Sequence, residues 1–80
     1  MPHLEIVGNG ALNLNGCGQS VPAWCKNDLL AKQYAPKSYK KTGFDTAHLS
    51  RYVGTDFIQW YGRRADGYFH AWGPIFKIVT

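Results

Sequence analysis

Residues 57–79 have the sequence FIQWYGRRADGYFHAWGPIFKIV, and this stretch decides the fold. Aromatic and β-branched side chains are frequent in it, and both kinds favour β-strands. They predict three strands, at residues 57–61, 68–72 and 75–79. Arg63-Arg64-Ala65-Asp66-Gly67 predicts a turn between the first two strands, and Gly73-Pro74 predicts a break between the last two.

The middle of the chain has the pattern of one amphipathic helix. Ser20 is a favourable N-cap, Pro22 fits the first turn, and the helix should end near Tyr34, before Pro36. Apolar residues fall on one stripe at helical spacing, namely Val21, Trp24, Cys25 and Leu29. We expect Trp24 and Leu29 to pack on the sheet, against Phe57, Ile58, Phe69, Phe76 and Ile78.

Two further segments complete the fold. Residues 4–7 and 11–15 predict short strands joined as a hairpin by Gly8-Asn9-Gly10, because Asn-Gly tolerates positive φ. Residues 45–53 predict either a short helix closed by Gly54 or a strand that begins near His48. The expected fold class is α+β, with one main helix packed on a small antiparallel sheet, in a single domain of residues 1–80.

Composition limits the function. Eighty residues leave no room for a separate cofactor domain, and the formal net charge is +4. No secretory signal and no apolar run of about 20 residues is visible, so we expect a cytoplasmic protein without membrane contact. Cys17 and Cys25 should then be free thiols. No cysteine or histidine spacing matches a metal site, and no glycine motif matches a phosphate loop, so we expect no cofactor and no metal.

The most specific local motif is Asn15-Gly16-Cys17-Gly18. A thiol just ahead of a helix meets the positive end of the helix dipole, which stabilises the thiolate form. The flanking glycines let a substrate backbone come close. The alternative is that Cys17 only fills a tight glycine turn, as a small apolar residue.

This motif resembles that of papain-like cysteine peptidases, especially the double-glycine leader peptidases. These enzymes present a Cys-Gly dipeptide at the start of their first core helix, as Cys17-Gly18 does ahead of residues 21–34. The resemblance implies a minimal papain-like scaffold with Cys17 as the nucleophile and His70 as the base. No Gln precedes Cys17 and no Asp or Asn follows His70, where the family has such residues. We therefore expect a binding protein rather than an active enzyme.

Basic residues lie beside aromatic ones in two places, and they supply the candidate binding residues. These are Lys40, Lys41, Trp60, Tyr61, Arg63 and Arg64. Such residues hold single-stranded nucleic acid by phosphate contact and base stacking, or they bind an acidic protein surface. The remaining interpretation is a solvated turn beside core aromatic residues.

In size, single-domain economy and incomplete active site, the chain resembles the small anti-CRISPR proteins of phages and mobile elements. This class-level resemblance implies an inhibitor that binds a host defence nucleoprotein complex and blocks its nucleic-acid or subunit site. The expected partner is a host protein or ribonucleoprotein with an acidic patch or exposed RNA, which suits the charge of +4. The alternatives are a minimal papain-like cysteine peptidase or amidase and a basic nucleic-acid-binding module.

Overall fold

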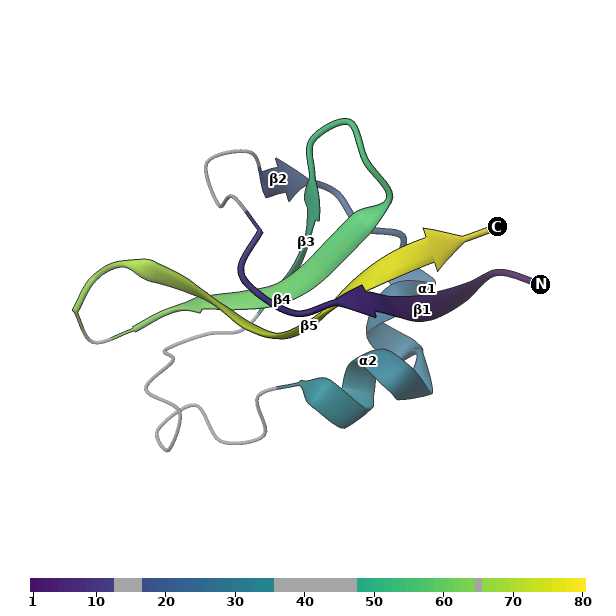
Figure 1. The fold of residues 1–80 in the computed structure, drawn as a ribbon, viewed down its shortest axis with the longest axis horizontal. Helices are drawn as coiled ribbons and strands as arrows, with labels where there is room; N and C mark the ends of the chain where they lie inside the picture. The colour runs from purple at the N-terminus through teal and green to yellow at the C-terminus, as the bar shows by residue number, and fades with distance from the viewer. Residues whose placement is uncertain (13–16, 36–47, 65) are drawn as a thin grey trace.

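The computed structural model describes residues 1–12, 17–35, 48–64 and 66–80, with the backbone alone for residues 17–19 (Figure 1). In chain order, the elements of this part are β1 (His3–Gly8), β2 (Cys17–Gln19), α1 (Ala23–Asn27), α2 (Leu29–Tyr34), β3 (His48–Tyr52), β4 (Phe57–Arg63) and β5 (Phe69–Val79). Neither of these two helices is long and apolar enough to cross a membrane.

The strands form one sheet in the order β1-β5-β4-β3-β2, and every neighbouring pair is antiparallel. The first and last strands therefore lie side by side, purple and yellow in Figure 1. The two helices lie against each other, and α2 lies beside β5 (Figure 1). The α+β class and the antiparallel sheet are confirmed.

The expected single main helix is wrong, because the helical segment is broken at Asp28. Asp28 has a ψ of 135°, and its carboxylate accepts a hydrogen bond from Leu30 N at 2.9 Å. An aspartate in this conformation caps a new helix, so α2 begins immediately after it. α1 begins after Pro22, not after Ser20. Leu29, the first residue past the break, is 84% exposed, so its expected packing on the sheet is also wrong.

The expected break at Gly73-Pro74 is wrong as well, because β5 runs through it without interruption. The register shifts there: Ile58 pairs with Phe76, but Trp60 pairs with Trp72. β5 therefore carries two extra residues as a bulge. Gly73 adopts a φ of +75°, which glycine tolerates, and the bulge accommodates a proline that has no N–H to donate.

Gln59 links this bulge by hydrogen bonds to the segment that follows β1. Its side chain is buried, and its Nε2 donates to the carbonyl oxygens of Gly73 at 2.8 Å and Gly10 at 2.7 Å. Its Oε1 accepts from Leu12 N at 3.0 Å. The expected N-terminal hairpin is wrong over its described part, because β1 pairs with β5 and residues 11–12 belong to no strand. The rest of that expected strand, residues 13–15, lies outside the described residues.

Residues 48–52 form β3, which confirms the strand alternative for this segment. β3 pairs with β4 from His48 opposite Tyr61 to Arg51 opposite Ile58. The competing helix over residues 45–53 is therefore wrong from His48 onward, and residues 45–47 lie outside the described part.

The core lies between the helices and one face of the sheet. Its buried apolar residues are Leu4, Cys25, Ala31, Leu49, Ile58, Trp60, Phe76 and Ile78. The core positions expected for Ile58, Phe76 and Ile78 are confirmed, and Trp24 packs against them while half-buried. The core positions expected for Phe57 and Phe69 are wrong, since these side chains are 37% and 53% exposed.

Candidate functional site

Neighbouring residues of β4 point to opposite faces of the sheet. Ile58 and Trp60 point toward the helices, since both are buried in the core and Trp60 Nε1 donates to the Ala31 carbonyl oxygen at 2.9 Å. Tyr61 and Arg63 therefore point to the opposite side, which we call the outer face.

Three rings from three neighbouring strands meet on the outer face. The centroid of the His48 ring lies 5.7 Å from that of Tyr61, which lies 5.7 Å from that of Phe69. We call these three residues, from β3, β4 and β5, the aromatic row. His48 and Phe69 are exposed and Tyr61 is half-buried, so the row presents aromatic surface to solvent.

Two arginines lie at the Phe69 end of the aromatic row. Arg63 is the exposed last residue of β4 and pairs directly with Phe69. Arg64 follows it, and its backbone N–H donates to the Tyr68 carbonyl oxygen at 3.0 Å. Tyr68 itself is 73% exposed. Positive charge and aromatic surface therefore share this end of the β4–β5 hairpin.

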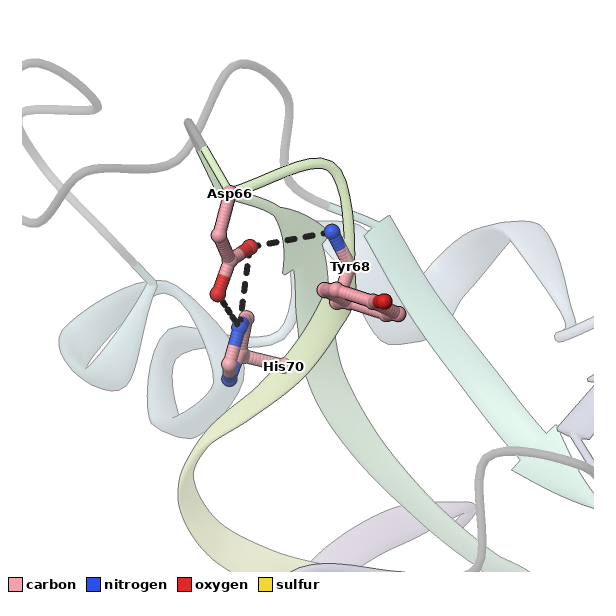
Figure 2. A network of polar contacts seen from close by, with 3 residues as sticks. All are labelled: Asp66, Tyr68 and His70. Carbon is pink, nitrogen blue, oxygen red and sulfur yellow. Dashed lines mark hydrogen bonds and ion pairs between the residues drawn. The ribbon is translucent and has the colours of Figure 1, made fainter.

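Asp66, Tyr68 and His70 hold the turn of this hairpin (Figure 2). Asp66 Oδ1 accepts a hydrogen bond from Tyr68 N at 2.9 Å, and Asp66 Oδ2 lies 3.0 Å from His70 Nε2. Gly67, with a φ of +85°, donates its N–H to the Arg64 carbonyl oxygen at 2.9 Å. The Tyr68 N–H, and after it the His70 side chain, lower the pKa of Asp66. The predicted turn between the two strands is confirmed.

A cavity of about 280 Å³ lies at the His48 end of the aromatic row. The residues that line it are Ser20, Val21, Lys26, His48, Leu49, Ser50 and Tyr61. One wall is the segment from Ser20 into α1, and the other is formed by β3 and β4. In the described sheet, β2 pairs with β3 only at Arg51 and Tyr52, so the cavity occupies the edge of β3 that β2 leaves open.

The structure does not bring the backbones of Cys17 and His70 together. They lie on β2 and β5, which are three strand spacings apart, about 14 Å at ~4.8 Å per spacing. Cys17 pairs with Tyr52 near one end of β3, whereas His70 pairs with Gly62 near the other end of the sheet. A nucleophile and its base need direct hydrogen-bond contact, about 3 Å. Cys17 also lies in a strand and not at the start of α1.

The acid beside His70 precedes it in the chain. The peptidase resemblance implied an Asp or Asn after His70, whereas Asp66 lies four residues before it. The Asp66-Gly67 turn was the signal that could have located this pair, since a tight turn folds the following strand back over the residues before it.

The other predicted site residues have different outcomes. Lys40 and Lys41 lie outside the described residues. Trp60 is not on a surface: it is buried, with its indole N–H bonded to α2, which corrects the expectation that it binds a partner. Tyr61, Arg63 and Arg64 do lie together at the outer face and the hairpin end.

His48 and Phe69 were not predicted from the sequence as binding residues. Their signal was the strand pattern, since each lies beside Tyr61 once β3, β4 and β5 are aligned. Within the described parts of the chain, no group of His, Cys, Asp and Glu residues is placed to hold a metal ion. No family model, no curated protein and no solved structure matches this chain.

Proposed function

We propose that this chain is a binding protein without catalytic activity that holds single-stranded nucleic acid on its outer face. The observation that carries the proposal is the aromatic row, three rings in contact across three strands, of which His48 and Phe69 are exposed and Tyr61 is half-buried. Exposed aromatic side chains on a sheet stack unpaired bases in several kinds of RNA-binding domain. Every base has a π-face, so such binding tolerates many sequences.

The charge near the row supports a nucleic-acid partner. The net charge is +4, and Arg63 lies on the same face as Tyr61 and opposite Phe69 in the register. A base stacked on Phe69 brings its phosphates within reach of an arginine side chain, whose fork of donors suits phosphate oxygens. An acidic protein would pair with the arginines and pack on the rings, whereas unpaired bases stack on the ring faces; the polyglutamate comparison below separates the two partner classes.

The inhibitor role belongs to the same proposal. A small protein that covers single-stranded RNA or DNA in a host defence complex blocks the strand through which that complex finds its target. Such complexes work in the cytoplasm of the host cell, so the proposal places this anti-CRISPR-like activity there. The distance between the strands that carry Cys17 and His70 favours this binding role over a peptidase.

Fluorescence anisotropy with labelled oligouridine and oligothymidine at low salt tests the proposal. We expect both to bind better than a blunt duplex, with a steep dependence on salt because phosphate contacts release counterions. Phe69→Ala should weaken binding roughly 5- to 150-fold, which corresponds to the ~1–3 kcal/mol of one stacked base. Phe57→Ala is the matched control, since Phe57 is a half-exposed phenylalanine of the outer face away from the row.

Three outcomes would contradict the proposal. The first is the absence of oligonucleotide binding at low salt. The second is an equal loss of affinity in Phe69→Ala and Phe57→Ala. The third is binding to polyglutamate but not to oligonucleotides, which would identify an acidic protein as the partner class.

A further inference from the structure

We propose that the cavity beside the aromatic row binds a phosphate group of the nucleic-acid strand. This inference rests on the proposed function and adds to it the place where the backbone of the strand is held. The cavity and the row share two residues, His48 and Tyr61. A nucleotide whose base stacks on these rings therefore has its own phosphate beside the cavity.

The side chains that line the cavity match a phosphate in charge. Lys26 is the lysine among the lining residues, and its ammonium group supplies positive charge. Among the described lining residues, none is acidic. A phosphate that enters the cavity therefore meets attraction from Lys26 and no opposing carboxylate from these walls.

The same side chains match a phosphate in hydrogen bonding. The residues that line the cavity include Ser20, Ser50 and Tyr61, which carry hydroxyl groups, and Lys26, which carries an ammonium group. Hydroxyls and ammonium groups are donors that phosphate oxygens accept from. Ser20 and Lys26 come from the segment that leads into and includes α1, and Ser50 and Tyr61 come from β3 and β4, so both parts of the lining contain residue types that bind phosphate.

The cavity is large enough for a phosphate group. Its volume of about 280 Å³ lies just below the ~300–1,000 Å³ typical of sites that enclose a small-molecule ligand. It has room for a phosphate and part of a sugar, while the base stays outside on the row. Both a terminal phosphate and a backbone phosphate have this chemistry.

One NMR titration and one anisotropy measurement test the inference. Titration of the whole protein with inorganic phosphate should shift the His48 and Lys26 signals, and Lys26→Gln should abolish the shift at His48. Lys26→Gln should also weaken oligonucleotide binding about tenfold, as expected for one charge-assisted hydrogen bond. Lys32→Gln is the matched control, because Lys32 is an exposed lysine of α2 that does not line the cavity.

Oligonucleotides with a 5′-phosphate, a 3′-phosphate or no terminal phosphate distinguish the two sources. A preference for one phosphorylated end that Lys26→Gln removes supports a terminal phosphate, and equal affinities that all depend on Lys26 support a backbone phosphate. If oligonucleotides bind but phosphate shifts nothing near His48 and Lys26→Gln equals Lys32→Gln, the cavity inference is overturned and the proposed function stands. If no oligonucleotide binds, the proposed function fails, and the phosphate titration still decides the cavity.

Discussion

The two faces of the sheet use aromatic residues in different ways, and Trp60 and Tyr61 show the difference within one step of the chain. Trp60 faces the helices, is buried, and donates its indole N–H to α2. Tyr61 faces outward and is half-buried. Its ring contacts the exposed rings of His48 and Phe69 on the two neighbouring strands. The first ring therefore belongs to the folded core, whereas the second belongs to a surface that a partner can cover.

Rings on the two faces contribute to different properties, those in the core to stability and those of the aromatic row to binding. A ring in the core is buried when the chain folds, so removing that ring lowers the free energy of unfolding. A ring of the aromatic row keeps much of its surface in water in the folded protein, so it becomes fully buried only when a ligand binds. Mutations on the two faces should therefore change different measurements.

The largest expected effect is that of Trp60→Ala on stability. The change removes a buried indole and leaves the Ala31 carbonyl oxygen without its donor, so the protein should lose about 3–5 kcal/mol of unfolding free energy. Phe69→Ala is the counterpart on the outer face and should cost about 1 kcal/mol or less, because the ring is half-exposed. Urea denaturation measures both. Equal losses in the two variants would break the distinction between the faces.

A smaller loss of stability is expected for Gln59→Leu, which tests a buried polar position on the outer face. Leucine keeps much of the bulk but leaves three backbone groups, at Gly10, Leu12 and Gly73, without their partner. We expect a loss of about 2–4 kcal/mol in urea denaturation. Gln33→Leu, at an exposed position of α2, is the control and should cost little. A loss no greater than that of the control would mean that the bulge does not depend on Gln59.

These residues also show which parts of the fold the sequence could predict. Strands rich in aromatic and β-branched residues were predictable, because their local pattern agrees with their tertiary surroundings. The continuity of β5 was not, because Gly73-Pro74 is a local breaker that is overridden by a hydrogen bond from Gln59, 14 residues away in the chain. The end of α1 was missed for the opposite reason: Asp28 is a strong local cap that the apolar stripe concealed.

The candidate site was predictable only in part. Arg63 and Tyr61 were predicted as binding residues because basic and aromatic residues lie next to each other there in the sequence. His48 and Phe69 join them only through the pairing of three strands, and no local pattern states which strands are neighbours. Trp60 was assigned to the wrong side, because alternation along a strand gives two faces without saying which one the helices cover.

The smallest expected effect concerns Asp66, at the exposed end of the hairpin. The Tyr68 N–H is the larger cause that lowers the pKa of Asp66 below its ordinary value of 3.8, and His70 is the second. His70→Ala should therefore raise the pKa of Asp66 only part of the way back. A pH titration of the carboxyl carbon by NMR measures the pKa in both proteins. A complete return to the ordinary value would make His70 the main partner.

The same pKa shift fixes a weak dependence of stability on pH. The pKa of Asp66 is lower in the folded than in the unfolded chain, so the stabilisation is fully present above the unfolded-state value of about 3.8 and is lost as the pH falls through the folded-state pKa. Asp66→Asn keeps an oxygen that accepts from Tyr68 N but removes the charge. It should be slightly less stable than the wild type near neutral pH, where Asp66 is ionised, and the difference should vanish in acid once Asp66 is protonated. A difference that persists unchanged at the acid end would show that the turn depends on the shape of the aspartate and not on its charge.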